Sequence, residues 1–465
     1  MMRNPRPLSD LNSQHSNRNC PSFIKGSLSG IGFVASVALV SLGTWSNGVS
    51  AQSTSTDLVS VYEQAKTYDA SYQAARFNLE AATSNVPIAR SRLLPEINVG
   101  AEAGVASTSG DIQGSYENTA VGLNLRQTVY NRASGKLLDQ ARIGVQQAEA
   151  QYAAIGQNLI LRVAEAYFNV LRAQADVEFS QSELQAIRRQ REQAERRFDV
   201  GLVPITDVRS AQAQYDLAIA QEIAASNSLS TAREALLVIS GVDAQALTPL
   251  AGDLPLTPPK PANVDAWVER AKEQNLDLVI ASLNSQNSAT QVSIQRAARL
   301  PTLDLVGRVA STTTEQNLSR DRDITDIKLE LNLPIYSGGR VNAQVAQAQA
   351  ESRAAEQNLL AQERTTTQQT RDAYRGVQAS ISQVKALRQA LVSTQKSAEA
   401  TEAGFRAGTR TSVEVLQALR DTFRAQSDYS SARYDYIINT LNLKAASGIL
   451  NERDLASINR FLAAP

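Results

Sequence analysis

Residues 198–208 and 405–415 of this 465-residue chain read FDVGLVPITDV and FRAGTRTSVEV. Each stretch places a glycine three residues after a phenylalanine, and these glycines are Gly201 and Gly408. A glycine suits the position just after the last residue of a helix, and Pro204 suits the start of the helix that follows. The two stretches therefore predict two helical hairpins whose tip turns contain Gly201 and Gly408.

The same spacing recurs along the rest of the chain, which indicates a tandem duplication. Four pairs of motifs lie 206 or 207 residues apart: RLLP (92–95) and RLP (299–301), VYN (129–131) and IYS (335–337), FDVG (198–201) and FRAG (405–408), SG (240–241) and SG (447–448). We therefore divide the chain into a first repeat at 52–248, a proline-rich linker at 249–262, a second repeat at 263–450 and a C-terminal tail at 451–465.

Each repeat contains a long stretch with apolar residues at the three- and four-residue spacing of a coiled coil. In the first repeat this seam includes Val145, Ala148, Tyr152, Ile155, Leu159, Val163, Ala166, Val170, Ala173 and Val177. The spacing predicts long helical hairpins at 134–240 and 338–447, with a first helix roughly 100 Å long at about 1.5 Å per residue. A shorter helix with the same spacing opens each repeat, and Pro87 should kink or end the first of these.

Before each long hairpin the apolar period changes to two, which predicts β-strands at 96–107, 119–130, 302–311 and 326–336. Apolar residues such as Leu329 alternate with charged residues such as Glu330. This pattern suits a transmembrane β-barrel with a wet lumen, although an amphipathic hairpin on a soluble core has the same period. Four strands cannot close a barrel, so two, three or more chains would have to pool their strands. A soluble helical rod, the alternative for the helices alone, leaves these strands unexplained.

The N-terminus carries the features of a secretory signal peptide. Basic residues ending at Lys25 precede an apolar run at 31–42, and Val49-Ser50-Ala51 provides a small-residue cleavage site. We expect residues 1–51 to be a signal peptide that is removed after Ala51. The apolar run is short for an uncleaved membrane anchor, so export is the favoured interpretation.

Composition excludes several classes of function. The only histidine and the only cysteine are His15 and Cys20, and both lie in the predicted signal peptide. A Ser-His-Asp triad, a cysteine nucleophile, a zinc site with His or Cys ligands and structural disulfides are therefore excluded from the exported chain. The formal net charge is zero, which argues against nucleic acid as a partner. We expect no enzyme activity, no catalytic residue, no cofactor and no metal site.

The predicted elements follow the order helix, strand, strand, long helix, glycine turn and return helix, and this order occurs twice. Together with residues 201–208 (GLVPITDV) and 404–416 (GFRAGTRTSVEVL), the order resembles the TolC family of outer-membrane exit ducts. The resemblance implies a mixed α and β fold, in which long antiparallel coiled-coil hairpins form an α-barrel joined to a transmembrane β-barrel. It also implies a homotrimer that completes a twelve-stranded barrel in outer-membrane lipid, with its helical tunnel in the periplasm.

The resemblance further implies a function in transport. Ducts of this family dock onto inner-membrane translocases through periplasmic adaptor (membrane fusion) proteins, and they export drugs in multidrug efflux or proteins in type I secretion. Two alternatives remain on the residues alone. A passive diffusion porin would not need helices of this length, and a periplasmic adaptor would need lipoyl-like and barrel segments around a single hairpin.

The resemblance places the gate at the hairpin tips, which form the periplasmic mouth. A lock that links neighbouring hairpins and keeps the entrance closed is implied at Thr206, Asp207, Phe405 and Arg410. Constriction rings are implied at Glu414 and Gln417. This sequence departs from the family pattern twice, because Phe405 lacks the tyrosine hydroxyl that would bond to Asp207 and Gln417 is uncharged where a second acidic ring is expected.

A simpler interpretation of the same carboxylates is helix capping. Thr411-x-x-Glu414 is a capping-box pattern, and Asp207 lies three residues after Pro204, where an acidic side chain complements a helix N-terminus. Such a cap contributes about 1 kcal/mol. The arginine-rich segment at 188–197 predicts a solvated helix face with intrahelical ion pairs, and an adaptor contact near the tip is the alternative.

Overall fold

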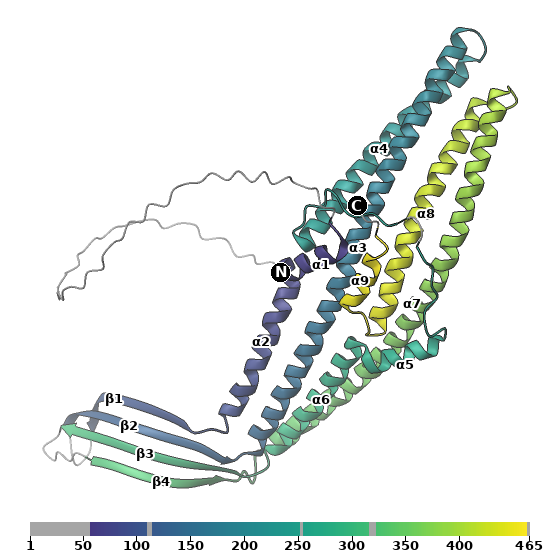
Figure 1. Cartoon of the computed structure of the whole chain (residues 1–465). Helices are drawn as coiled ribbons and strands as arrows, with labels where there is room; N and C mark the ends of the chain where they lie inside the picture. Colours follow the sequence, from purple (N-terminus) through teal and green to yellow (C-terminus); the bar gives the residue numbers. More distant parts are fainter. Residues whose placement is uncertain (1–55, 109–113, 252–253, 316–321, 463–465) are drawn as a thin grey trace, which may run out of the picture. The chain divides into compact units, whose positions relative to one another are not determined.

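The computed structural model of the chain describes residues 56–108, 114–251, 254–315 and 322–462 (Figure 1). The chain divides into two units, Met1–Gln52 and Ser53–Pro465, and every described residue belongs to the second. The predicted signal peptide at 1–51 and its cleavage site lie outside the described residues.

Two short helices open each repeat. They are α1 (Leu58–Tyr68) and α2 (Ala70–Ser91) in the first repeat, and α5 (Val264–Gln274) and α6 (Leu276–Ala297) in the second. The Asp69 carboxylate accepts a hydrogen bond from the backbone N–H of Tyr72 at 2.7 Å and so caps α2. The sequence predicts that Pro87 kinks or ends the first helix; because α2 continues through Pro87 to Ser91, Pro87 does not end it. The break lies at Asp69 instead, because its side chain satisfies backbone groups that a helix start leaves open.

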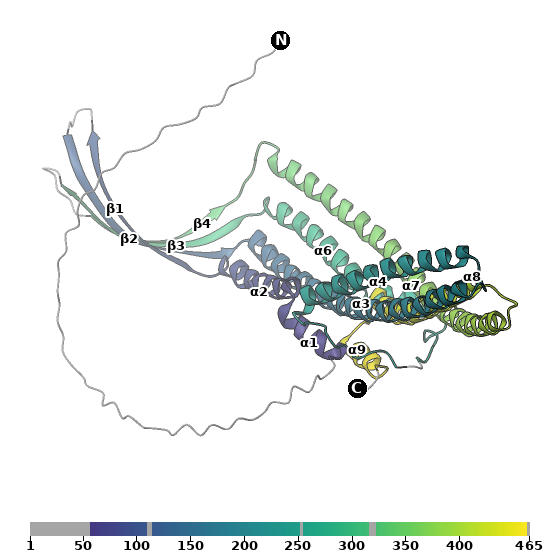
Figure 2. The ribbon, with the colours of Figure 1, turned by 90° about the horizontal axis from the view of Figure 1, so that it is seen from above.

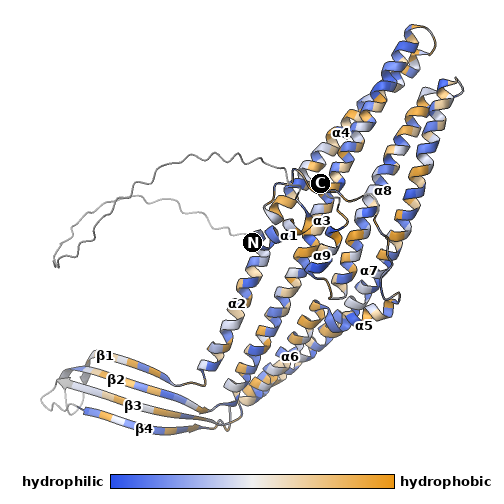
Figure 3. Ribbon diagram, viewed as in Figure 1, coloured by the Kyte–Doolittle hydropathy of each residue, from blue (hydrophilic) through white to orange (hydrophobic). Residues whose placement is uncertain are grey.

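Two helical hairpins follow, and they lie side by side (Figure 1). The first consists of α3 (Arg132–Asp199) and α4 (Ile205–Ser240), and the second of α7 (Arg340–Arg406) and α8 (Ser412–Ala446). With 68 residues, α3 is roughly 100 Å long. Figure 3 shows hydrophobic and hydrophilic residues mixed along these helices, as expected of narrow apolar seams.

No helix in the four described ranges combines the length and the apolar character that crossing a bilayer requires.

Four strands form one antiparallel sheet in the order β1-β2-β3-β4. The strands are β1 (Glu96–Thr108), β2 (Gly114–Tyr130), β3 (Thr302–Glu315) and β4 (Arg322–Asn332). Three predicted strands differ from the structure in their bounds: β2 begins at Gly114 and not at about 119, and β3 ends at Glu315 and not at about 311. The strand predicted at about 326–336 begins at Arg322 and stops at Asn332. Pro334 explains the early end in part, since proline cannot donate a ladder hydrogen bond.

The register of the sheet gathers the apolar side chains on one face. Ile97 is opposite Leu125, Leu125 is opposite Gly307, and Gly307 is opposite Ile327. Directly paired residues share a face, so this face also carries Val99, Val121, Leu123, Val309, Leu329 and Leu331, each of which is more than 40% exposed. The other face carries charged groups, among them Arg126, which lies 2.7 Å from the Asp304 carboxylate across β2 and β3.

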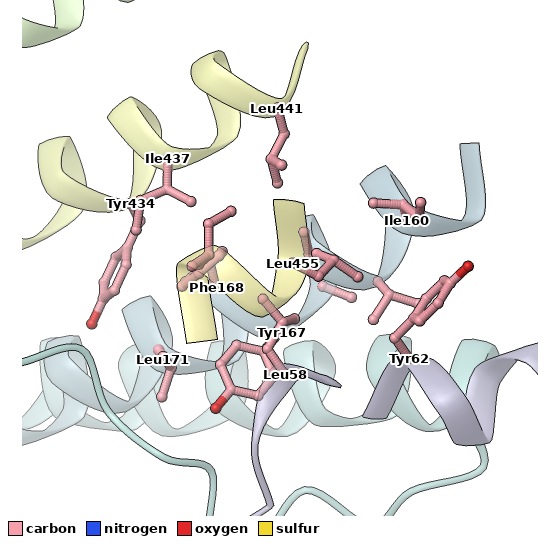
Figure 4. Close-up of a cluster of buried hydrophobic side chains, with 14 of the residues drawn as sticks. Leu58, Tyr62, Ile160, Tyr167, Phe168, Leu171, Tyr434, Ile437, Leu441 and Leu455 are labelled. Atoms are coloured by element: carbon pink, nitrogen blue, oxygen red, sulfur yellow. The ribbon is translucent and has the colours of Figure 1, made fainter. Parts of the chain in front are cut away.

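The main hydrophobic core lies partway along the hairpins and includes residues of α1, α3, α4, α5, α7, α8 and one further short helix. Figure 4 shows side chains from α1, α3, α8 and the short helix α9 (Glu452–Asn459) directed into one cluster. Tyr167 and Phe168 of α3 are fully buried there with their rings edge to face at 5.6 Å, and Leu455 of α9 is 1% exposed. The segment predicted as a C-terminal tail at 451–465 therefore contributes a helix to the core. The Asn459 amide also donates to the Asp57 carboxylate at 2.7 Å, which ties α9 to the start of α1.

Candidate functional site at the hairpin tips

Both tip turns are built around a glycine with positive φ. Gly201 has φ 73° and Gly408 has φ 78°, a backbone conformation that L side chains rarely adopt. The N–H of Leu202 donates to the Arg197 carbonyl at 2.9 Å, and the N–H of Thr409 donates to the Gly404 carbonyl at 2.9 Å. These bonds satisfy carbonyls that the ends of α3 and α7 would otherwise leave unpaired. The turns thus have the same backbone geometry in both repeats.

The second tip is a complete capping box that also holds an arginine. The Thr411 N–H donates to Glu414 Oε2 at 2.7 Å, and the Glu414 N–H donates to Thr411 Oγ1 at 3.3 Å. Arg410 Nη1 lies 2.8 Å from Glu414 Oε1. The Thr411 backbone bond, followed by the Arg410 bond, lowers the pKa of the Glu414 carboxyl. Glu414 is therefore a charged side chain in open solvent at neutral pH, already engaged by its own helix.

Because Gly404 has no side chain, it leaves room for the side chain of Arg410. A Cβ placed on Gly404 would come within 2.8 Å of Arg410 Cγ and 3.2 Å of Thr409 Oγ1. The aliphatic part of Arg410 therefore lies against the backbone of the last turn of α7, which directs its guanidinium toward Glu414.

Two contacts join the tips of the two hairpins. Ser412 Oγ donates to Asp207 Oδ2 at 3.3 Å, which links the first turn of α8 to the first turn of α4. Phe405, only 7% exposed, lies beneath Arg197 of α3, whose guanidinium carbon is 4.3 Å from the ring centroid. A cation over an aromatic face is attractive. Phe405, which lacks the hydroxyl of a tyrosine, therefore contacts the other hairpin through its ring.

Further from the tips, a groove of about 780 Å³ separates the two hairpins. Gln417 lines it and donates to Asp421 at 2.9 Å. Arg420 spans the groove, with Nε 3.6 Å from Glu183 of α3 and Nη1 donating to Gln214 of α4 at 3.0 Å. Burial raises the pKa of Glu183, and the nearby Arg420 charge opposes that rise in part. Arg420 thus connects α3, α4 and α8.

The structure brings some of the sequence-predicted residues together and leaves others apart. Asp207, Phe405, Arg410 and Glu414 all lie at the two tips, and Thr206 is exposed beside Asp207. Within the described part of the chain, Arg410, in the turn before α8, forms its ion pair with Glu414 of its own hairpin and not with Asp207 of the other hairpin. Two of the expected intrahelical pairs in the arginine-rich segment are present, Arg188–Glu192 at 3.2 Å and Arg191–Glu195 at 3.4 Å.

Sequence reasoning missed Ser412, Arg197 and Arg420. Each of them acts across two helices that are distant in sequence, and no local pattern marks such a partner. A search for side chains at equivalent positions of the two repeats would have pointed to the Ser412 region, because Ile205 and Ser412 both begin a return helix. Among the described residues no group of three or more His, Cys, Asp and Glu side chains is arranged to hold a metal ion.

Comparison with known proteins gives a consistent result over most of the chain. The family model for outer membrane efflux proteins matches residues 61–242 and 267–449, so it matches each repeat once. The outer membrane protein TolC of Vibrio cholerae serotype O1 is 38% identical over 424 residues, which cover 90% of this chain and 95% of that protein. The proteases secretion protein PrtF of Dickeya chrysanthemi is 27% identical over 86% of this chain and 90% of its own length.

A solved structure shares the fold. The crystal structure of CusC, described in terms of folding and transmembrane channel formation, superimposes with a TM-score of 0.76. It is 16% identical and covers 85% of this chain and 92% of that chain.

Proposed function

The chain belongs to the outer membrane efflux protein family, and from this membership we propose that it forms a gated exit duct for multidrug efflux and type I secretion. The protein is an outer-membrane channel with a periplasmic helical tunnel. The proposal adds a homotrimer, a periplasmic adaptor and an inner-membrane translocase as partners, and drugs or proteins as cargo.

One observation carries the proposal: the sheet exposes a continuous apolar face and has two open edges. In the described part of the chain β1 pairs with β2 alone and β4 pairs with β3 alone. An apolar face is stable when it contacts lipid, whereas unpaired strand edges are not tolerated in lipid. The sheet therefore requires further strands, and three copies would supply the twelve of a closed barrel whose lumen is lined by the charged face.

The helical hairpins supply the other half of the duct. They extend roughly 100 Å from the sheet, which suits a tunnel that reaches across the periplasm to an inner-membrane partner. A passive porin has no use for this length. An adaptor has no use for a sheet with an exposed apolar face, so neither alternative accounts for both features.

We place the gate at the tips. In the proposed trimer, Arg410 of one copy exchanges its partner Glu414 for Thr206 and Asp207 of the neighbouring copy as the mouth closes, and Phe405 packs at the same junction. Glu414 and Gln417 line the constriction. The support for this placement is that Asp207 already contacts the second hairpin through Ser412, and that the Arg410 side chain is 57% exposed, so its guanidinium can be reached by a neighbouring copy.

The decisive experiment images the purified outer-membrane protein by electron microscopy and records its conductance in planar bilayers. A tapered particle with threefold symmetry and discrete conductance steps would support the duct. A compact monomer would overturn it, and a conductance that ignores every tip substitution would favour the porin.

A further inference from the structure

The open edges of the sheet raise the question of how β4 of one copy meets β1 of the next. No second chain is needed to address it, because the duplication places an equivalent junction inside the chain. The two hairpins β1–β2 and β3–β4 are copies of each other, so the junction between β2 and β3 is the internal counterpart of the junction between β4 and a neighbouring β1.

The duplication extends to strand pairing. Glu96 is opposite Arg126 in the first strand pair. Adding 206 to both numbers gives Thr302 and Asn332, and these two residues are opposite each other in the second pair. The 206-residue offset that aligns Pro95 with Pro301 and Tyr130 with Tyr336 therefore also aligns the two hairpins residue by residue. A relation that holds for both strands of each hairpin can be applied to the strands at the junction.

Within the chain, Arg126 of β2 is opposite Val306 of β3, and Leu125 is opposite Gly307. Adding 206 to the residue number in β2 and subtracting 206 from the residue number in β3 gives the equivalent pair at the junction between β4 of one copy and β1 of the next. We call this junction between copies the seam. We propose that β4 pairs with β1 of the neighbouring copy in this register, with Asn332 opposite Gly100 and Leu331 opposite Ala101. This inference rests on the proposed duct, because it presumes that copies of the chain share one barrel.

The transferred register keeps the faces of the sheet continuous. It places Leu329 opposite Ala103 and Ile327 opposite Val105, so apolar residues meet apolar residues on the exposed face. A seam slipped by one residue would place charged side chains of β4 on that face instead. The register has one unfavourable contact, Glu330 opposite Glu102 on the charged face, where like charges repel. Lys328 lies 2.8 Å from Glu330 and offsets that repulsion.

The same register predicts that the seam lengthens β4. Between β2 and β3 the pairing continues to Tyr130, with a register shift between Thr128 and Tyr130. The equivalent residues after β4 are Pro334 and Tyr336, which are not in a strand in the single chain. Ile335 is 93% exposed and Tyr336 is 89% exposed there.

A proline is tolerated next to an irregularity of the ladder, and a register shift is such an irregularity. We therefore expect residues 333–336 to become strand only when β1 of the next copy is present. The shift turns Tyr336 toward the apolar face opposite Ile97. Tyrosine is favoured at the membrane interface, where barrels carry a girdle of aromatic residues.

Pairs of cysteines test this register directly, because the chain after the predicted signal peptide has no cysteine of its own. The full chain, with Cys20→Ser in every variant, is expressed in the outer membrane and oxidised in isolated membranes. The matched pair is Gly100→Cys with Asn332→Cys, and a Cβ at Gly100 meets no atom within 4 Å. The displaced pairs combine Asn332→Cys with Asn98→Cys or with Glu102→Cys, on the same face but two residues away.

The matched pair should shift the protein from monomer to covalent dimer and trimer on a non-reducing denaturing gel, and the displaced pairs should leave it monomeric. Directly opposite Cβ atoms lie about 4.5–5.5 Å apart and diagonal ones about 7–8 Å, so the difference in yield should be large. Asn124→Cys with Arg308→Cys, opposite each other within the chain, serves as the intramolecular control and should oxidise without forming oligomers.

The outcomes separate this inference from the proposed function. Efficient cross-linking by a displaced pair, or none by any seam pair while the intramolecular control oxidises, overturns the register. If the uncross-linked protein forms trimers in either case, the duct stands and only the seam is wrong. If no variant and no parent protein assembles, the proposed function fails as well.

Discussion

A charge placed on the apolar face of the sheet should destabilise the assembled protein far more than the loss of a charge from the opposite face. Leu329 lies on the apolar face of β4, is 65% exposed and is opposite Leu305. Glu330 is the next residue, lies on the charged face and forms an ion pair with Lys328. We therefore predict that Leu329→Arg prevents stable trimers, whereas Glu330→Gln leaves assembly intact.

The geometry of β4 sets the size of the effect. In the assembled barrel, where residues 333–336 would extend β4, its apolar residues run from Ile327 to Ile335. Eight steps of about 3.3 Å give about 26 Å along the strand, or about 20 Å along the membrane normal for a strand tilted by about 40°. That height covers most of the roughly 25 Å apolar band of a transmembrane barrel, and its centre falls at Leu331, two residues from Leu329. An arginine near the midplane costs roughly 2 to 4 kcal/mol, and a trimer carries three copies. Glu330→Gln removes only an ion pair between two exposed side chains, which contributes little.

The assay compares parent and variants by the resistance of the trimer to heat in detergent and by unfolding in urea. Leu329→Ala is the matched control, because it shortens the same side chain without adding charge. Leu329→Arg should lose the trimer band while Leu329→Ala and Glu330→Gln keep it. Equal losses for the arginine and the glutamine variants would show that the two faces of the sheet are assigned wrongly.

Three further predictions concern the tips and the core. Glu414→Ala should remove cation selectivity and block by multivalent cations, because three copies of this carboxylate would converge at the constriction. Arg410→Ala should raise single-channel conductance by releasing neighbouring hairpins, and Phe405→Tyr should lower the open fraction by restoring a hydroxyl at the junction. Leu455→Ala should destabilise the core by about 2–5 kcal/mol in urea unfolding, whereas exposed Ser457→Ala should change stability little.

Each of these has a result that would contradict it. Planar-bilayer recordings test the tip variants. If cation block persists in Glu414→Ala, and if the Arg410 and Phe405 variants leave conductance unchanged, then these residues only cap helices and pack at the hairpin junction. An unfolding midpoint unchanged by Leu455→Ala would mean that α9 lies on the core without stabilising it.

Much of the fold follows from the sequence because its signals are long and repeated. The coiled-coil spacing spans ten apolar positions from Val145 to Val177, and the period-two spacing occurs in four strands. The duplication doubles every signal, so that Gly201 and Gly408 locate both turns with a shared backbone geometry. The capping box at Thr411 and Glu414 was equally accessible, since both partners lie within one helical turn.

The parts that sequence reasoning missed depend on distant partners. Pro87 looked like the stronger break in the first helix, yet Asp69 interrupts it, supported by Arg162 of α3 at 3.0 Å. Helix α9 is only eight residues long, too short for a clear period, and its place in the core depends on α1 and α3. The contact between Ser412 and Asp207 exists only because two hairpins lie side by side. Local patterns report none of these.

The two repeats also indicate which features serve the fold and which serve the gate. The positive-φ glycine, the return helix and the strand register occur in both copies, so each is explained by the need to build the same architecture twice. The tip side chains differ between the copies. The first tip exposes Val200 and Leu202 at 67% and 73%, whereas the second carries Arg410, Thr411 and Glu414 in a charged cap. The difference in tip side chains is not needed to form the turns, because both turns contain the same backbone hydrogen bonds. We therefore propose that the second tip supplies the charged groups Arg410 and Glu414 to the gate, with Thr206 and Asp207 of the first hairpin as partners of Arg410, and that the apolar residues of the first tip are available for contact with another surface.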